Sequence, residues 1–247
     1  MSDSELKLYL EKLLKKYDFI KPKLPRLVMI FGLLGDFDSF EYVSNAIKYQ
    51  RNKSNETNKE LDLVVIAIGT EEGKKQFCKF TGLPQNNLII VEDNKIHKDL
   101  GISCGLDIGL GGWINMILML SGIGSPMTIK EVIRGYTGDK NSDQIFDNND
   151  QINLFNIFKF SGSLFNKSFG ENYLRPLELA TFRLNNMIEI IKNWNDYIPN
   201  TKYLPQRGAS FLINKDNEII YKYFSTDLLC YSENINSPMN FLNNYLN

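Results

Sequence analysis

Two apolar runs of strand length constrain the fold of this chain more than any other feature. Residues 26–32 (RLVMIFG) and 61–69 (LDLVVIAIG) are almost continuously apolar, which is typical of strands buried on both faces of a parallel sheet. The segment between them repeats apolar residues at helical spacing: Phe40, Val43, Ala46 and Ile47. The pattern predicts a β-α-β unit. We expect the polar stretch 51–60 to be an exposed loop, because burial would leave its polar groups without partners.

Further elements flank this unit. Ser2 and Glu5 have the spacing of a capping box at the start of an amphipathic helix. After the second strand, a short helix is predicted over 71–80, and a third strand is predicted over 88–91.

The C-terminal part has equally clear signals. A Lys-Asp-Asn turn joins the apolar runs 209–214 and 218–224, which predicts an antiparallel hairpin, and a last helix is expected near Pro238. Before the hairpin, Pro176 opens a long helix. We expect its apolar stripe to pack on the sheet, and that stripe consists of Leu177, Ala180, Leu184, Met187, Ile188 and Ile191.

This order of elements predicts one domain over residues 1–247, with 43% hydrophobic residues to form a single large core. Its expected parts are an N-terminal helix (1–24), a β-α-β-α-β half (25–100), an insertion (101–175) and a C-terminal part with a helix, the hairpin and a final helix (176–247). The insertion is predicted to be largely helical, with an apolar helix around Trp113 and a second helix capped by Thr128 and Glu131.

Charge and cysteine content exclude several classes of function. With 28 basic and 29 acidic residues the formal net charge is -1, so no positive field attracts a nucleic-acid backbone. Cys78, Cys104 and Cys230 are too few and too scattered for a small disulfide-rich secreted protein, although a Cys104–Cys230 pair stays open. The start of the chain lacks the pattern of a secretory signal, and we expect a cytoplasmic protein.

The longest uncharged stretch runs from Ile108 to Ile129, about the length needed to cross a bilayer. Five glycines and Pro126 interrupt it. We therefore expect a buried helix over 113–120 followed by a Gly-Ile-Gly turn, and a peripheral membrane contact is the alternative.

The turn after the first strand, Gly35-Asp36-Phe37-Asp38-Ser39, holds the candidate site. A helix that begins here presents unpaired N–H groups and a positive dipole, which can stabilise a thiolate or accept a capping side chain. No cysteine is present in the turn. One interpretation is that Asp36, Asp38 and Ser39 cap the helix and have no further role.

Around this turn, VMIFGLLGDFDSFEY resembles the first strand and turn of the AhpC/TSA peroxiredoxin-like family, within the thioredoxin-like superfamily. It looks most like a cyanobacterial and plastid branch with a Gly-Asp-Phe-Asp-Ser turn. The likeness continues through IGTEEGKKQFCKFTGLP, SGIGSPMTIKEVIRGYTGD, RPLELATFRLNNMIEIIKNW and QRGASFLI. It implies an α/β, thioredoxin-like fold of the peroxiredoxin type, with three layers around a central mixed sheet. Related members have Gly-Cys-x-x-Cys in the turn, so Asp36 and Ser39 fall on the two cysteine positions.

The resemblance also implies a position for Arg207. It matches the arginine of the peroxiredoxin Arg-Gly-x-Phe-x-Ile strand, which lies beside the peroxidatic cysteine and polarises the peroxide. Without that cysteine, we expect Arg207 to form an ion pair with Asp36 or Asp38. Cys78 is the alternative reactive thiol if it faces the same pocket, although a single cysteine with aromatic neighbours is usually an inert apolar residue.

Two functions remain open. Neither a carboxylate nor a hydroxyl can pass through the sulfenic acid cycle, which favours a redox-inactive protein that binds a protein partner or small ligand beside Asp36, Ser39 and Arg207, or through the uncharged segment. The alternative is a divergent thiol-dependent antioxidant enzyme using Cys78 or another cysteine. The only histidine, His97, lies near no suitable nucleophile and is expected at the surface. No motif predicts a metal or a cofactor.

Overall fold

The computed structural model describes residues 2–19, 22–57, 61–154, 158–167, 174–234 and 236–246. The N-terminal elements are α1 (Asp3–Lys16), β1 (Arg26–Leu33), α2 (Phe37–Thr57), β2 (Asp62–Ile68), α3 (Glu71–Thr81), η1 (Gln85–Asn87), β3 (Leu88–Val91) and α4 (Lys95–Asp99). Then follow α5 (Gly112–Leu120), α6 (Pro126–Thr137), β4 (Gln151–Leu154), β5 (Phe158–Ser161) and α7 (Ser163–Lys167). The last elements are α8 (Arg175–Lys192), α9 (Trp194–Tyr197), η2 (Thr201–Tyr203), β6 (Ala209–Ile213), β7 (Ile219–Phe224) and α10 (Asn240–Leu246).

The central sheet has five strands in the order β3-β2-β1-β6-β7. The strand β1 pairs in parallel with β2 and antiparallel with β6, so that Val28 lies between Val64 and Phe211. On the outside, β3 is parallel to β2 and β7 is antiparallel to β6. The expected mixed sheet and the C-terminal hairpin are therefore confirmed, and every residue of the central strand β1 is buried.

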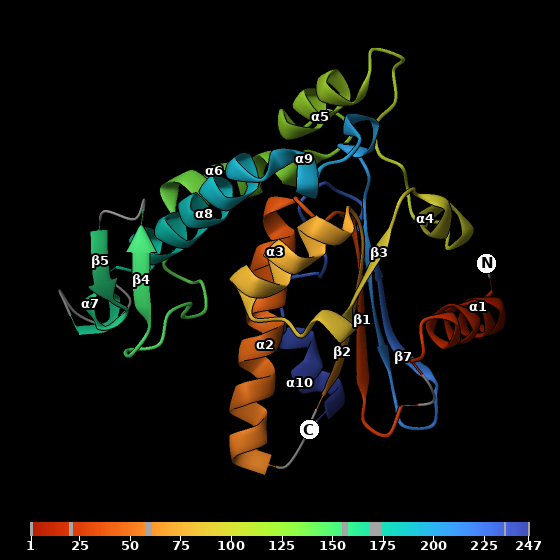
Figure 1. The fold of residues 1–247 in the computed structure, drawn as a ribbon, viewed down its shortest axis with the longest axis horizontal. Helices are drawn as coiled ribbons and strands as arrows, with labels where there is room; N and C mark the ends of the chain where they lie inside the picture. Colours follow the sequence, from red (N-terminus) through yellow and green to blue (C-terminus); the bar gives the residue numbers. More distant parts are fainter. Residues whose placement is uncertain are drawn as a thin grey trace.

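Helices cover both faces of the sheet and give the expected three layers (Figure 1). Because side chains alternate along a strand, Leu27, Met29 and Phe31 join one core with residues of α2, α3 and α10. Val28 and Ile30 join the other core with α1 and the residues that follow α4. The capping box of α1 is present: Ser2 Oγ accepts from the N–H of Glu5, and Glu5 Oε2 accepts from the N–H of Ser2 at 2.7 Å.

Two expectations about the helices are wrong. The helix α2 continues through residues 51–57, where a loop was expected, and residues 58–60 lie outside the described residues. The long helix α8 packs against α2 and α6 rather than on the sheet, because α2 and α3 already cover that face. In its predicted apolar stripe, Leu177 and Ile191 are 53% and 61% exposed. The buried residues of α8 are instead Arg175, Glu178, Leu179, Thr181, Phe182, Asn186 and Ile190.

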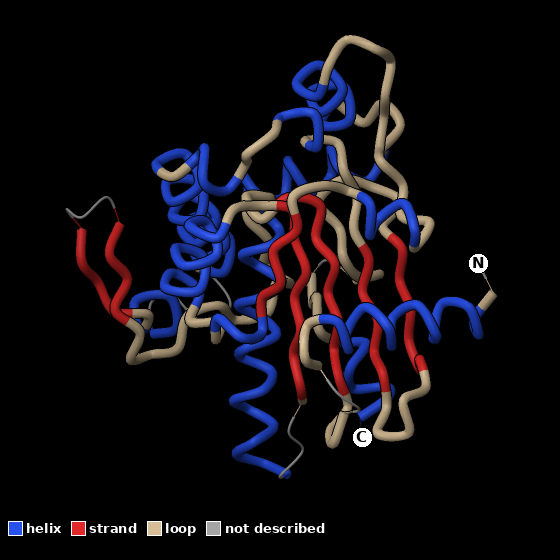
Figure 2. Tube along the Cα trace, turned by 45° about the vertical axis from the view of Figure 1, so that its right-hand side comes forward, coloured by secondary structure: helices blue, strands red, loops and turns tan. Residues whose placement is uncertain are grey.

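The segment 101–175 contains α5, α6 and α7, and also a feature that we did not expect from the sequence. Strands β4 and β5 form a separate antiparallel pair, which stands apart from the central sheet with α8 between them in both views (Figures 1 and 2). The predicted cap of α6 is also wrong, because Ser125 precedes this helix and the hydroxyl of Thr128 donates to the carbonyl of Leu228. Among the described residues, no helix is long and apolar enough to span a membrane.

Candidate functional site

The turn from β1 into α2 is tightly packed. A β-carbon on Gly35 would lie 2.8 Å from Cβ of Tyr197, closer than two carbon atoms can approach, so this position requires glycine. The side chain of Asp36 then turns back to the start of α2, and its Oδ1 accepts from the N–H of Asp38 at 3.2 Å. Asp36 therefore caps the first turn of α2, as the sequence predicted.

The second oxygen of Asp36 has a partner from the far end of the chain. The hydroxyl of Tyr231 donates to Oδ2 at 2.6 Å and also accepts from the N–H of Gly32 at 3.3 Å. Desolvation raises the pKa of the Asp36 carboxyl, while the Tyr231 hydrogen bond acts in the opposite direction. The carboxylate at this position of the turn is thus engaged on both oxygens.

Ser39 behaves differently from the expected cap. Its side chain is fully buried, and its hydroxyl donates to the carbonyl of Leu33 at 3.2 Å. A hydroxyl that donates to the end of the preceding strand is not accepting from the helix. The link from Ser39 to the capping residue is made by its backbone, whose N–H donates to the carbonyl of Asp36.

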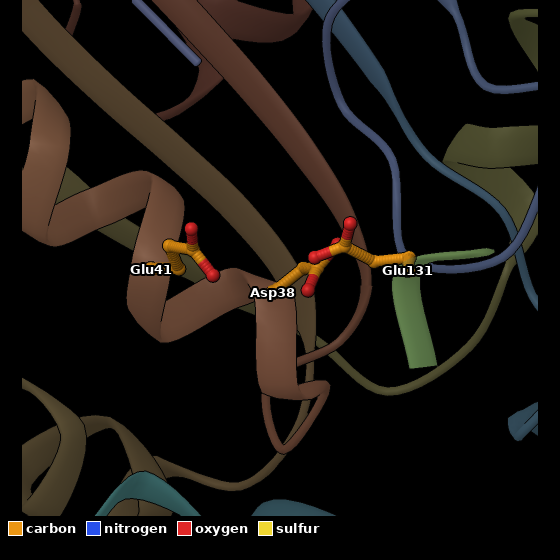
Figure 3. Close-up of side chains that lie close together, drawn as sticks. All are labelled: Asp38, Glu41 and Glu131. Carbon is orange, nitrogen blue, oxygen red and sulfur yellow. The ribbon is translucent and has the colours of Figure 1, made fainter. Parts of the chain in front are cut away.

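Asp38 belongs to a buried charge network rather than to a cap. Together with Glu41, one turn further along α2, and Glu131 of α6, it forms a group whose oxygens lie within 4.8 Å of one another. The carboxylates of Asp38 and Glu131 point toward each other (Figure 3). We refer to Asp38, Glu41 and Glu131 as the acidic triad.

Two arginines contact the acidic triad. Arg183 of α8 contacts all three carboxylates through Nη2, at 3.5 Å from Asp38 and 2.6 Å from Glu41, and it also bonds Glu131. Arg134 of α6 lies 2.7 Å from Glu131 and 3.6 Å from Glu41. The guanidinium of Arg183 stands where a metal ion would have to be, so the residues present do not fit a metal.

The network retains an excess of negative charge, with three carboxylates facing two guanidiniums. Asp38 Oδ2 and Glu131 Oε2 are buried and accept no hydrogen bond from the described residues. Desolvation is the main cause that raises the pKa of both carboxyls, against the attraction of Arg183. The same network raises the pKa of Arg183 and keeps it charged.

Arg207 does not reach this network, which corrects the expected ion pair with Asp36 or Asp38. Its guanidinium donates instead to the carbonyl of Gly124 at 2.5 Å and to the hydroxyl of Ser103 at 3.4 Å. Arg207 therefore ties the segment before α6 to the start of β6. Arg183, and not Arg207, lies beside Asp38.

The three cysteines are free, so the possible Cys104–Cys230 pair is not formed. Cys78 lies on α3 and is buried in the hydrophobic core, and burial raises the pKa of its thiol. Burial also raises the pKa of Cys230, to about 11. Cys104 alone of the three is exposed. Its Sγ lies 3.4 Å from the amide nitrogen of Asn94.

Cys104 lines a cleft of about 790 Å³. The cleft is formed by the loop after β3, by α4, by the segment before α5 and by η2, and its lining includes Asn94, Lys98, Asn115, Lys202 and Gln206. It lies beyond the carboxyl end of a parallel strand, which is where α/β sheets commonly bind ligands.

His97 is not at the surface. His97 belongs to α4, and its ring is fully buried. The ring points toward the central strand, where Nε2 lies 2.8 Å from the carbonyl oxygen of Phe31. Desolvation lowers the pKa of this imidazole. A carbonyl can only accept, so Nε2 carries the proton.

Sequence reasoning missed Arg183, Arg134, Glu41 and Tyr231. A signal for Arg183 was available, because Leu179, Phe182, Asn186 and Ile190 share a second helical spacing on α8 and leave Arg183 beside the buried face. We found no comparable signal for Tyr231, which lies in an irregular segment.

Comparison with known proteins gives one match. The profile of the family described as AhpC/TSA antioxidant enzyme matches residues 48–227 of the chain. No curated protein and no solved structure matches it. The matched range begins after the turn at residues 35–39, so the equivalence of Asp36 and Ser39 with two cysteine positions stays a prediction.

Proposed function

This chain belongs to the AhpC/TSA antioxidant enzyme family, and we propose that it is a binding protein without thiol peroxidase activity. The observation that carries the proposal is the engagement of Asp36. Peroxide reduction at this turn requires a thiolate that attacks the O–O bond and becomes a sulfenic acid. Here a carboxylate occupies the start of α2, hydrogen-bonded to Tyr231 and to the helix itself.

The two thiols that are not exposed also support the absence of peroxidase activity. Cys78 and Cys230 each have a raised pKa, and a raised pKa lowers the fraction of thiolate at neutral pH. Cys78 is also 6% exposed, which restricts the approach of peroxide.

The cleft beside Cys104 is the proposed binding site. Its volume of about 790 Å³ lies within the range of small-molecule pockets. The lining combines Lys95, Lys98 and Lys202 with Asp93, Asp99 and Asp107, so neither sign of charge dominates. We propose a polar ligand without a large net charge, held by hydrogen bonds to side chains such as Asn115 and Gln206.

The absence of peroxidase activity is tested by intact mass measurement after stoichiometric hydrogen peroxide, with and without dithiothreitol. We expect slow oxidation spread over several residues and no catalytic consumption of peroxide. Rapid oxidation of one thiol, reversed by the reductant and accompanied by peroxide turnover, would overturn the proposal.

A second function is favoured by one observation, the exposure of Cys104 in the cleft beside the amide of Asn94. In this alternative Cys104 is the reactive thiol of a divergent antioxidant enzyme. Cys104→Ser would then abolish peroxide consumption, while Cys78→Ser, at a buried thiol, would leave it unchanged.

Binding in the cleft is tested by ligand-observed NMR with a library of polar, metabolite-sized compounds. Compounds that bind the wild type should lose binding when Cys104 is alkylated with N-ethylmaleimide, because the adduct fills part of the cleft. The control is the Cys104→Ser variant treated with N-ethylmaleimide in the same way, since it has no thiol at this position to react. If no bound compound is displaced by alkylation, the cleft is not the site.

A further inference from the structure

The acidic triad contains two buried carboxyl groups that each have one oxygen without a donor. Asp38 comes from the first turn of α2 and Glu131 from α6, and each is 1% exposed. Their carboxylates point toward each other (Figure 3). Asp38 Oδ2 and Glu131 Oε2 accept no hydrogen bond from the described residues, and a buried oxygen in that state is costly. We refer to Asp38 and Glu131 as the acid pair.

The arginines around the acid pair cannot balance the charge of the carboxyl groups that they contact. Arg134 and Arg183 together contact four carboxyl groups: Asp38, Glu41, Glu131 and Asp139. If all four were ionised, four negative charges would face two positive charges in a largely buried network. Uncompensated buried charge is expensive, and a carboxyl group avoids it by holding a proton.

The remaining neighbours of the acid pair supply no positive charge. The other titratable groups that act on Asp38, or on which Asp38 acts, are Asp36, Glu41 and Tyr42 of α2 and Cys230 and Tyr231 of the C-terminal segment. Each of these five is either neutral or negative. Burial raises the pKa of Cys230 and of both tyrosines, so these three stay neutral.

A proton accounts for the two oxygens without donors. An ionised carboxylate only accepts, so two facing carboxyl groups can bond to each other only when one of them is protonated. Desolvation is the main cause that raises the pKa of Asp38, and among the neighbouring carboxylates Glu131 contributes most. Two carboxyl groups that share a site in this way lose their protons in two separate steps.

We propose that Asp38 and Glu131 bind one proton between them, and that this shared proton attaches α6 to α2. The protonated carboxyl donates to the ionised one, which satisfies both members and removes one negative charge from the network. Loss of the proton would leave two like charges facing each other between the helices in a buried environment. The attachment of α6 would therefore weaken as the pH rises through the raised pKa of the acid pair.

The shared proton is tested by carboxyl ¹³C NMR on the full chain labelled at aspartate and glutamate, with the signals assigned through the backbone. We expect the acid pair to hold about one proton at pH values where the exposed carboxyl of Asp216 is already ionised. Ionisation of both members together with Asp216 would overturn the proposal. The donor to the two oxygens would then be a bridging water molecule, which leaves both carboxylates charged.

Replacement of one member separates a shared proton from burial alone. In Asp38→Asn the amide can donate to Glu131 in place of the proton, so the pKa of Glu131 should fall, and Glu131→Gln should lower the pKa of Asp38 in the same way. Asp139→Asn is the matched control, because it removes a carboxylate from Arg134 and leaves the acid pair intact. If each pKa stayed raised when the other member was replaced, sharing would be ruled out. The wild-type titration decides even if a variant does not fold.

Hydrogen exchange of the α6 amides tests the attachment of this helix. After correction for the intrinsic effect of pH on exchange, their protection in the wild type should fall by up to about tenfold per pH unit, the limit for release of one proton. Protection should stay level in Asp38→Asn, and circular dichroism checks that this variant folds. A change with pH that is equal in the two proteins would overturn the attachment of α6 through the proton.

Discussion

The hydroxyl of Tyr231 donates a hydrogen bond to the carboxylate of Asp36 at 2.6 Å. Tyr231 is 2% exposed, and it also accepts from the backbone of Gly32 on the central strand. One side chain from the C-terminal part thus joins the end of β1 to the start of α2. The start of α2, where Asp36 lies, is therefore part of the structural core.

Replacement of the Tyr231 hydroxyl should destabilise the fold. Tyr231→Phe leaves Asp36 Oδ2 and the N–H of Gly32 without this partner in a buried environment, and we expect a loss of about 1–3 kcal/mol in the free energy of unfolding. Urea denaturation measures it. Tyr245→Phe is the control, since Tyr245 is 45% exposed; equal losses in the two variants would contradict the role of the hydroxyl.

Removal of Arg183 should have a larger effect. Arg183→Met leaves the acidic triad without the cation that contacts all three carboxylates, and we expect a loss of about 3–5 kcal/mol. The double variant with Glu131→Gln should lose less than the sum of the two single changes, because one unpaired charge has been removed. Additive losses would show that the two side chains do not interact.

The control for Arg183 is Arg207→Met. Arg207 binds two neutral acceptors, Gly124 and Ser103, so its removal strands no carboxylate. We expect a smaller loss of stability than for Arg183→Met in the same urea titration.

The acidic triad should make stability fall as the pH rises. The pKa of Asp38 is raised in the folded protein, so the folded state holds this proton more tightly than the unfolded state. The stability from that proton is present below the ordinary pKa of an aspartate, about 3.9, and is lost as the pH rises through the raised pKa. The free energy of unfolding of Asp38→Asn should therefore rise relative to that of the wild type as the pH is raised from 4 to 8.

Urea denaturation across that range measures the difference. Asp216→Asn, at an exposed position of the β6–β7 turn, is the control for a carboxylate outside the network. A stability difference between Asp38→Asn and the wild type that does not change with pH would contradict a raised pKa.

His97 should make the stability of the fold decrease as the pH falls, which is opposite to the effect of Asp38. Burial lowers its pKa, so the unfolded state binds this proton more readily, and stability is lost as the pH falls below the ordinary value of about 6.5. In long-range ¹H–¹⁵N spectra, the single histidine should stay neutral with its proton on Nε2 at pH 6. The urea-unfolded chain is the reference, and coincident titration curves in the two states would refute the buried position.

The strands of the central sheet and most helices could be predicted from the sequence because their signals are local. The run at 26–32 became β1, the Lys-Asp-Asn turn became the β6–β7 hairpin, and Asp36 caps α2 as its position before the helix implied. Each of these depends on neighbouring residues and on the alternation or helical spacing of apolar side chains. The family resemblance then implied that these elements form three layers around a central mixed sheet, as the structure has them.

The partners of the polar residues depended on the tertiary structure. Arg183 lies beside Asp38, and Arg207 does not, because α8 packs on α2 and directs a polar side chain inward. In sequence, the buried polar residues of α8 and the ring of His97 look like those of a solvated surface, since burial depends on which element lies opposite. Local spacing therefore determined the central strands and most helices of this protein, whereas the long-range packing of α8, α4 and the C-terminal segment decided which charges and hydroxyls meet.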